Sequence, residues 1–300
     1  MIDLLNRIVA GVLPAVPKPI LWRFSKRYIA GSHLADALEC VRRLNGYGCA
    51  ATVDILGENA DEAEEASGYT RAYGEALDGI AEAGLDANAS VKLTALGQRV
   101  GEALVRENLE TLLVSAREHG NFIRLDMEDS STTSSTLQIY RDMRARGHDN
   151  VGVVLQSYMR RSRADVEDLV DLRPSYRLCK GIYREPREIA WHDPEAIRGN
   201  FVSLLRRMLE SGSYVGIATH DERLVWEAEE LIRRMGLGRD DYEFQMLLGV
   251  DAQMRRILVD RGHRVRIYVP FGEAWRAYSL RRMRENPDMV GHVMRNLLTR

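Results

Sequence analysis

Charged, amide and hydroxyl side chains recur at the ends of short apolar segments along this 300-residue sequence. Such groups can orient a small charged substrate, hold a cofactor or transfer a proton. The residues concerned are Lys92, Asp126, Glu128, Gln156, Arg177, Lys180, Thr219, His220, Gln245 and Tyr268. Any one of them is better explained as a salt bridge, a helix cap or a buried amide. The prediction of a site therefore depends on many of them meeting at one place.

A second group of polar residues lies near the carboxyl end, where Tyr278, Arg281, Arg282 and Glu285 recur at spacings of three and four. In a helix these residues share a face. Two adjacent guanidinium groups that flank this face suit a small carboxylate, because each presents donors matched to two oxygens. A solvated basic face is the alternative explanation, and this segment alone does not exclude it.

Eight short segments rich in Val, Ile and Tyr predict eight β-strands. They span residues 49–56, 89–95, 121–127, 150–156, 176–180, 214–219, 242–247 and 264–269. Helical segments with charges on one face separate them, as at 60–84 and 108–120. Apolar strands alternating with helices indicate parallel pairing, and eight such units close into a (β/α)8 barrel. The polar strand ends would then meet at one mouth.

The domain organisation predicted from this pattern is a single barrel over residues 46–300, preceded by a helical segment over residues 1–45. A doubly wound open sheet is the competing architecture. It usually has fewer strands, and its first strand is followed by a GxGxxG turn, which this sequence lacks. We therefore favour the barrel.

The overall composition excludes several classes of protein. The formal net charge is −2 with no basic stripe, which argues against nucleic-acid binding. Cys40, Cys49 and Cys179 lie far apart, which argues against a zinc site or a disulfide framework and favours a cytoplasmic protein. No segment approaches the roughly 20 apolar residues of a spanning helix. Residues 1–22 predict an amphipathic packing helix, and peripheral contact with a membrane through it stays open.

The sequence resembles the proline dehydrogenases, found alone or as the catalytic domain of larger bifunctional chains. The matching stretches are TVDILGE (52–58), SVKLTALG (90–97), RLDMEDS (124–130), LQSYMRR (155–161), YRLCKGIYREP (176–186), IATHD (217–221), EFQMLLGV (243–250) and IYVPFGEAWRAYSLRRMRENP (267–287). They follow the family order. The resemblance implies a distorted (β/α)8 TIM barrel whose final helix covers the mouth. It also implies non-covalent FAD, and oxidation of L-proline to 1-pyrroline-5-carboxylate, the first step of proline catabolism to glutamate.

The resemblance also implies roles for the residues around the substrate. Arg281 and Arg282 would pair with the substrate carboxylate, with Lys92 nearby and Glu285 holding one of the arginines. The residues that would shape the pocket around the five-membered ring are Tyr268, Tyr278 and Leu247. Because relatives that prefer hydroxyproline tend to lack an aromatic residue at the position of Tyr268, this residue favours proline as the substrate.

Further roles implied by the resemblance concern the flavin. Asp126 would anchor the constellation beneath it, and Arg177 would lie near its reactive nitrogen, where a positive charge favours the reduced flavin. The residues at positions that hold the flavin are Gln156, Lys180, Gly181, Tyr183, Thr219 and His220, with Gln245 and Glu128 close to the site. One departure from the family pattern is Ile182, which stands where alanine is usual.

Three other activities stay open at this level. The enzyme could oxidise a close analogue such as hydroxyproline or N-methylproline. It could be a lyase in which Lys92 or Lys180 forms a Schiff base with a carbonyl substrate. It could also be a barrel that binds a carboxylate ligand without catalysis. For a flavoenzyme we expect a quinone as the electron acceptor, although a soluble carrier or oxygen is compatible. The oligomeric state is open, and no metal is expected.

Overall fold

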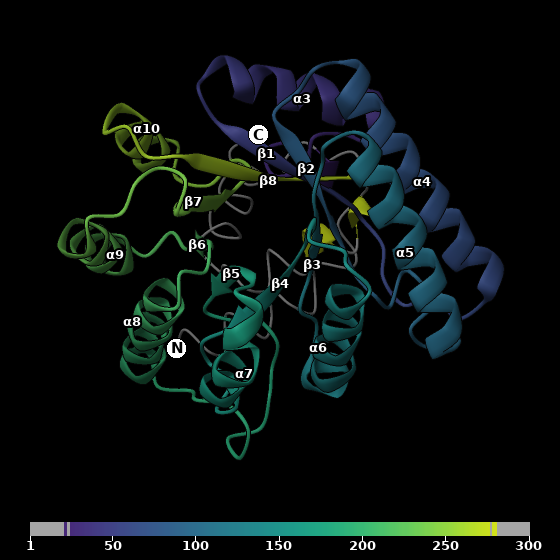
Figure 1. Ribbon diagram of the computed structural model, residues 1–300. Helices are drawn as coiled ribbons and strands as arrows, with labels where there is room; N and C mark the ends of the chain where they lie inside the picture. Colours follow the sequence, from purple (N-terminus) through teal and green to yellow (C-terminus); the bar gives the residue numbers. More distant parts are fainter. Residues whose placement is uncertain (1–20, 23–24, 277, 281–300) are drawn as a thin grey trace.

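A computed structural model of the chain describes residues 21–22, 25–276 and 278–280. Eight parallel strands pair in sequence order and close through β8 on β1 (Figure 1). They are β1 (Ala50–Ile55), β2 (Ala87–Val91), β3 (Ile123–Leu125), β4 (Val151–Gln156), β5 (Ser175–Cys179), β6 (Val215–Ala218), β7 (Tyr242–Leu247) and β8 (Val265–Phe271). The (β/α)8 prediction is confirmed, and the doubly wound open sheet is excluded.

Helices form a ring outside the strands (Figure 1). They are α3 (Leu34–Gly46), α4 (Ala63–Glu82), α5 (Glu102–Glu118), α6 (Ser130–Ala145), α7 (Ser162–Leu169), the short 3-10 helix η2 (Val170–Leu172), α8 (Pro194–Glu210), α9 (Glu222–Met235) and α10 (Ala252–Asp260). In α9, buried residues such as Leu224, Ala228 and Leu231 recur at helical spacing and form the side packed on the barrel. The helix ends at Gly236, whose φ of 65° suits glycine.

Several element boundaries differ from the sequence prediction by a few residues, and two of the differences lie around Lys92. Strand β2 ends at Val91, so Lys92 lies just beyond the strand instead of within it. The carbonyl of Lys92 accepts hydrogen bonds from the backbone of Ala95 and Leu96, which turns the chain there. The following helix α5 begins at Glu102, six residues earlier than expected. The earlier end of β2 places Lys92 at the mouth of the barrel, where it lines a cavity.

The interior of the barrel is polar over much of its length. Side chains from non-neighbouring strands meet inside it: Arg177 of β5 donates to Ser90 of β2 at 3.0 Å, and Tyr268 of β8 donates to Asp126, just beyond β3, at 2.7 Å. Barrels of this kind are usually filled by Val, Ile and Leu. Here the strands supply hydrogen-bonding groups to the core, so the barrel interior and the site share residues.

Two glycines make room for polar side chains in the barrel interior, Arg124 and Gln245. A Cβ at Gly152 of β4 would overlap the guanidinium of Arg124 and the backbone of Ser175. A Cβ at Gly216 of β6 would overlap the side-chain amide of Gln245. Neither glycine has a positive φ, so the requirement is for space and not for an unusual backbone conformation.

We expect Gly152→Ala to lower the free energy of unfolding by about 1–3 kcal/mol, because the added methyl group overpacks the barrel. Urea unfolding followed by circular dichroism measures the change. The control is Gly199→Ala in α8, where a Cβ would meet no neighbouring atom within 4 Å. That substitution should stabilise the protein by about 0.5–1 kcal/mol through helix propensity. Equal changes in the free energy of unfolding at both positions would contradict the conclusion that the barrel needs a glycine at position 152 for space.

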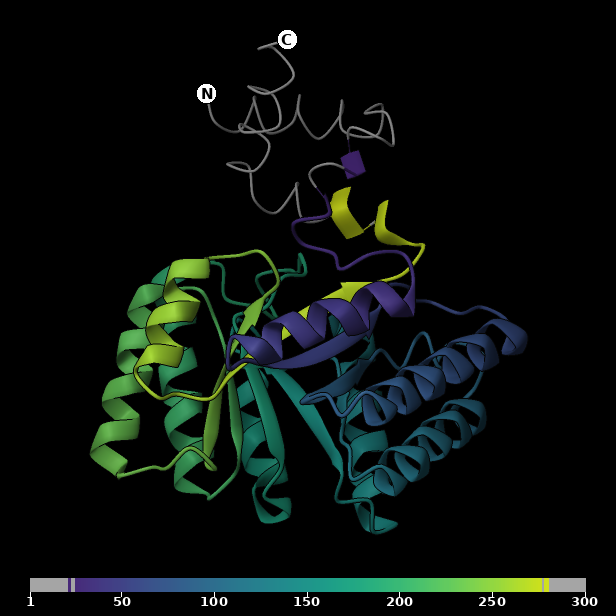
Figure 2. The ribbon, with the colours of Figure 1, turned by 90° about the horizontal axis from the view of Figure 1, so that it is seen from above.

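The segment after β8 returns over the mouth of the barrel beside the segment that precedes α3 (Figure 2). The backbone of Ala30 donates to Pro270, and that of Gly272 donates to Gly31. Residues 275–276 and 278–280 are helical, as predicted, and Tyr278 packs with Ile29 in a small apolar cluster. Within the described residues, no helix is both long and apolar enough to span a membrane.

Candidate active site

A cavity of about 460 Å³ lies at the carboxyl ends of the strands. The predicted site residues that line it are Lys92, Asp126, Glu128, Gln156, Arg177, Lys180, Gly181, Tyr183, Thr219, His220, Gln245, Leu247, Tyr268 and Tyr278. Arg281, Arg282 and Glu285 lie outside the described residues, so the carboxylate clamp stays a prediction. The structure thus brings together every described residue that the sequence singled out.

Asp126 is the central acceptor of the site. One of its carboxylate oxygens accepts hydrogen bonds from Ser90 at 2.7 Å and from Arg177 at 2.5 Å, and the other accepts from the Tyr268 hydroxyl at 2.7 Å. Burial raises the pKa of Tyr268 well above its ordinary value, and the nearby Asp126 carboxylate raises it further. Tyr268 therefore stays a neutral hydroxyl donor, and the four side chains form one fixed unit.

Lys92 lies beside this unit and is held by a residue that the sequence analysis missed. Its Nζ is 2.6 Å from Asp54 of β1, and both side chains are buried. Burial would lower the pKa of Lys92, but Asp54 and Asp126 raise it above its ordinary value. Lys92 is therefore an ammonium ion at neutral pH. The available signal was the carboxylate of Asp54 inside an otherwise apolar strand.

Glu128 follows β3 and faces the same cavity. The hydroxyl of Thr94 donates to it at 2.6 Å. Burial raises the pKa of Glu128 to about 7, more than the hydrogen bond from Thr94 and the charge of Lys92 lower it. The site therefore contains a carboxyl group that takes up or releases a proton near neutral pH.

We expect Glu128 to make the folded protein less stable as the pH rises from 4.5, its ordinary pKa, to about 7. In that range the folded protein holds a proton that the unfolded chain has lost, so the free energy of unfolding falls, by up to about 3 kcal/mol. Chemical unfolding at pH 5 and pH 8 measures this fall. In Glu128→Gln, which keeps an acceptor for Thr94, the fall should be smaller by that amount. An identical pH dependence in both proteins would contradict the assignment.

Another part of the cavity lining presents amide, ammonium and imidazole groups, which suit a polar ligand. The amide nitrogen of Gln156 donates to the backbone carbonyls of Met127 and Glu128, at 3.2 and 3.4 Å, which leaves its oxygen to accept from the cavity. The ammonium of Lys180 contacts Asp221 at 3.0 Å. His220 accepts a hydrogen bond from the backbone of Leu247 at 3.0 Å. Asp221 is a second residue missed from the sequence.

The loop between β5 and α8, residues 180–193, forms one side of this part of the lining and is fastened at several points. Glu185 accepts hydrogen bonds from the backbone and hydroxyl of Ser130 at the start of α6, at 2.7 and 2.8 Å. The backbone of Trp191 donates to Tyr158. Gly181 has a φ of 107°, and a Cβ there would overlap the ring of Tyr158. The loop is therefore packed too closely at Gly181 for any other residue.

The remainder of the cavity wall is apolar. It is formed by residues that include Met127, Val154, Met246, Leu247, Tyr278 and Ile182. Ile182 is 43% exposed at the rim. A cavity lined by both apolar and charged groups can hold a small ring and orient its polar groups at the same time.

The fold and this site define a class: (β/α)8-barrel proteins with a charged, partly apolar active-site cavity at the carboxyl ends of the strands. A family model described as proline dehydrogenase matches residues 37–295. The proline dehydrogenase of Deinococcus radiodurans is 35% identical over 282 residues, 93% of this chain and 91% of that protein. Proline dehydrogenase 2 of Bacillus subtilis strain 168 is 34% identical over 271 residues, 90% and 89% of the two chains. The chain belongs to the proline dehydrogenase family.

A solved structure of proline utilization A (PutA) from Bdellovibrio bacteriovorus, inactivated by N-propargylglycine, aligns with a TM-score of 0.83 at 25% identity. The alignment covers 88% of this chain and 33% of that one. The chain therefore spans about a third of this larger relative, over the same barrel fold.

Proline dehydrogenases are flavin-dependent, and the residues of this cavity fit such a group. A flavin ring has one polar edge and one apolar edge. The acceptor oxygen of Gln156 and the cations Arg177 and Lys180 match the first, and Val154 and Met127 match the second. Gly181 lines the cavity beside Lys180.

Proposed function

We propose that this chain oxidises L-proline to 1-pyrroline-5-carboxylate with a non-covalent FAD, as the first step of proline catabolism. The observation that carries the proposal is the hydrogen-bonded unit around Asp126, which includes Arg177 and Tyr268, with Lys92 beside it in one cavity at the carboxyl end of the barrel. A bound flavin would supply the chemistry by accepting a hydride from the ring carbon next to the substrate nitrogen.

The residues of the chain would bind, orient and shield the substrate. Arg281 and Arg282 would hold its carboxylate, with Glu285 beside them and the Lys92 ammonium adding positive charge. Tyr268, Tyr278 and Leu247 would pack on the ring and exclude water, so that the reacting carbon is held at contact distance. Arg177 would place a cation where negative charge develops on reduction. These roles are our proposal.

The Schiff-base alternative is not favoured. A lysine that attacks a carbonyl group must be a free amine, and Lys92 is kept protonated by Asp54. The Nζ of Lys180 contacts the carboxylate of Asp221 at 3.0 Å. Oxidation through a cofactor needs no nucleophile from the protein, which agrees with this pairing of both lysines.

We further propose FAD contacts from Gln156, Lys180, Gly181, Tyr183, Thr219 and His220, with Gln245 close by. A quinone is the proposed electron acceptor, reached by peripheral contact with the inner face of the membrane. One barrel over residues 46–300, with a helical segment before it, is the proposed domain organisation.

The visible spectrum of the purified chain, followed by anaerobic addition of L-proline, tests the function. We expect a flavin band that bleaches on proline addition. Hydroxyproline and N-methylproline, added to matched samples, should bleach it more slowly, because the hydroxyl of one and the methyl of the other need space beside Tyr268 and Leu247. A flavin band that proline leaves unchanged would overturn the proposed substrate. A chain that takes up no added FAD would overturn the proposed cofactor.

Substitutions should separate substrate binding from cofactor binding. We expect Arg281→Met and Arg282→Met each to raise the KM for proline by about 10- to 100-fold, because each removes a charge-assisted contact worth about 1.5–3 kcal/mol. The flavin content should not change. Arg284→Met controls for the loss of charge on the same segment. An unchanged KM in both arginine variants would refute the carboxylate clamp.

Lys180→Ala should instead lower the affinity of the chain for FAD, which is measured by the flavin absorption band that remains after gel filtration.

A further inference from the structure

A chain of buried hydrogen bonds runs from the lower end of the barrel to Arg177. Arg266 of β8 donates from Nε to Glu243 of β7 at 2.7 Å, and from Nη1 to the backbone carbonyl of Ala51 at 2.6 Å. The same carboxylate oxygen of Glu243 accepts from the amide nitrogen of Gln245 at 2.7 Å. The amide oxygen of Gln245 then accepts from Nε of Arg177 at 2.5 Å.

The direction of every bond in this chain is fixed by chemistry. Guanidinium groups only donate, and an ionised carboxylate only accepts. Burial would raise the pKa of Glu243, but the charge and hydrogen bond of Arg266 lower it to about 2, so Glu243 is ionised at neutral pH. Gln245 must therefore turn its nitrogen toward Glu243 and its oxygen toward Arg177. If the amide were reversed, its nitrogen would face the Nε donor of Arg177, and its oxygen would face the carboxylate of Glu243, which only accepts.

The contacts of Arg177 leave one part of its guanidinium for the cavity. Nε donates to Gln245, and Nη1 donates to Asp126 and Ser90. No hydrogen bond of Nη2 is found within the described part of the chain, and Arg177 lines the cavity. Gln245 and Asp126 thus hold the planar guanidinium of Arg177 through Nε and Nη1, and this fixes the direction of Nη2.

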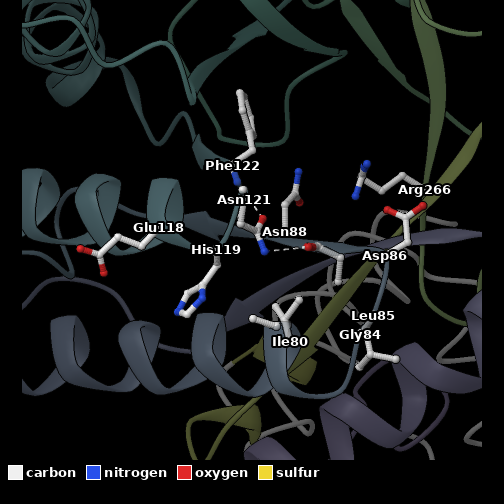
Figure 3. Close-up of a pocket in the computed structure, with 13 residues that line it drawn as sticks. Ile80, Gly84, Leu85, Asp86, Asn88, Glu118, His119, Asn121, Phe122 and Arg266 are labelled. Atoms are coloured by element: carbon white, nitrogen blue, oxygen red, sulfur yellow. Dashed lines mark hydrogen bonds between the residues drawn. The ribbon is translucent and has the colours of Figure 1, made fainter.

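The lower end of the chain is anchored away from the active site. Arg266 borders a second cavity, of about 520 Å³, at the amino ends of β2 and β3, where Asp86 and Asn88 also lie (Figure 3). Arg266 is 8% exposed and Glu243 is 2% exposed, so their pair is almost out of reach of solvent. Such a pair does not reorient readily, because breaking it would leave a buried charge without a partner.

We propose that Glu243 and Gln245 are positioning residues for Arg177, and that Gly216 provides the space their arrangement needs. The observation behind Gly216 is that a Cβ there would overlap the amide nitrogen of Gln245. The function of Arg177 rests on the proposed flavin chemistry, but its orientation does not. Gln245, which the sequence analysis placed close to the flavin site, acts here through Arg177.

Three variants of the full-length protein test the proposal. Gln245→Met removes the acceptor at similar volume. Glu243→Met with Arg266→Met replaces the buried pair together, which avoids an unpaired charge and favours folding. Gly216→Ala displaces the amide. The matched control is Thr52→Val, which removes the partly buried hydrogen bond from Thr52 to Asn88 at 2.5 Å; neither residue is among the hydrogen-bond partners of Arg177 within the described residues.

The first measurement is the hydrogen exchange of the Arg177 Nε–H group by nuclear magnetic resonance, with the signal assigned from its loss in Arg177→Lys. We expect exchange to be at least 10-fold faster in all three variants than in the wild type and Thr52→Val. Exchange at the wild-type rate in the three variants would overturn the proposal. The measurement needs neither proline nor turnover, so a wild-type protein inert to proline would overturn the proposed function alone.

The second measurement is the midpoint potential of the bound flavin, with kcat/KM for proline. We expect the potential of the three variants to become more negative and kcat/KM to fall by about 10-fold, the effect typical of losing a partner that orients a functional group. Thr52→Val should keep both wild-type values even if its melting temperature falls. A loss of melting temperature in the variants with unchanged potential would show a structural role only and would overturn the proposal.

Discussion

The burial of cations inside the barrel is the constraint on which the rest of the structure depends. Arg124, Arg177 and Arg266 have their guanidinium groups in the interior, where an unpaired charge would be destabilising by several kcal/mol. Arg177 and Arg266 are paired with the carboxylates of Asp126 and Glu243, and Arg124 donates to neutral acceptors such as the hydroxyl of Ser175. Closure of the barrel and compensation of these charges are therefore one condition. A strand pairing that shifted by one residue would break both.

This constraint divides the interior into a lower and an upper part with different tasks. In the lower part, Glu243 and Arg266 satisfy each other and face little solvent. In the upper part, Asp126 and Arg177 are likewise paired but also border the cavity. The lower pair gives the upper one a fixed support. A site built on strands and supported from below holds its geometry better than one carried by loops alone.

Much of this arrangement could be predicted from the sequence, because it follows from local patterns. Apolar segments alternating with helices gave the eight strands, and the polar residues at their ends met at one mouth as expected. Two kinds of feature could not be read in this way. Leu93 and Ala95 are buried in a turn and look like strand residues, so the predicted strand ran to residue 95, beyond the end of β2 at Val91. Asp54 and Glu243 are charges inside strands, and their partners, Lys92 and Arg266, become evident only from the strand register.

The fastening of the loop over residues 180–193 bears on how a ligand would be taken up. Glu185 holds this loop to the start of α6, and Gly181 is packed against Tyr158, so the loop is fastened by contacts within the protein. Ordering a flexible loop on binding would consume about 1–2 kcal/mol for each residue that becomes fixed. Here that entropy has already been lost during folding. Affinity for the cofactor is thus set largely by its direct contacts, and its association rate by access through the mouth of the barrel.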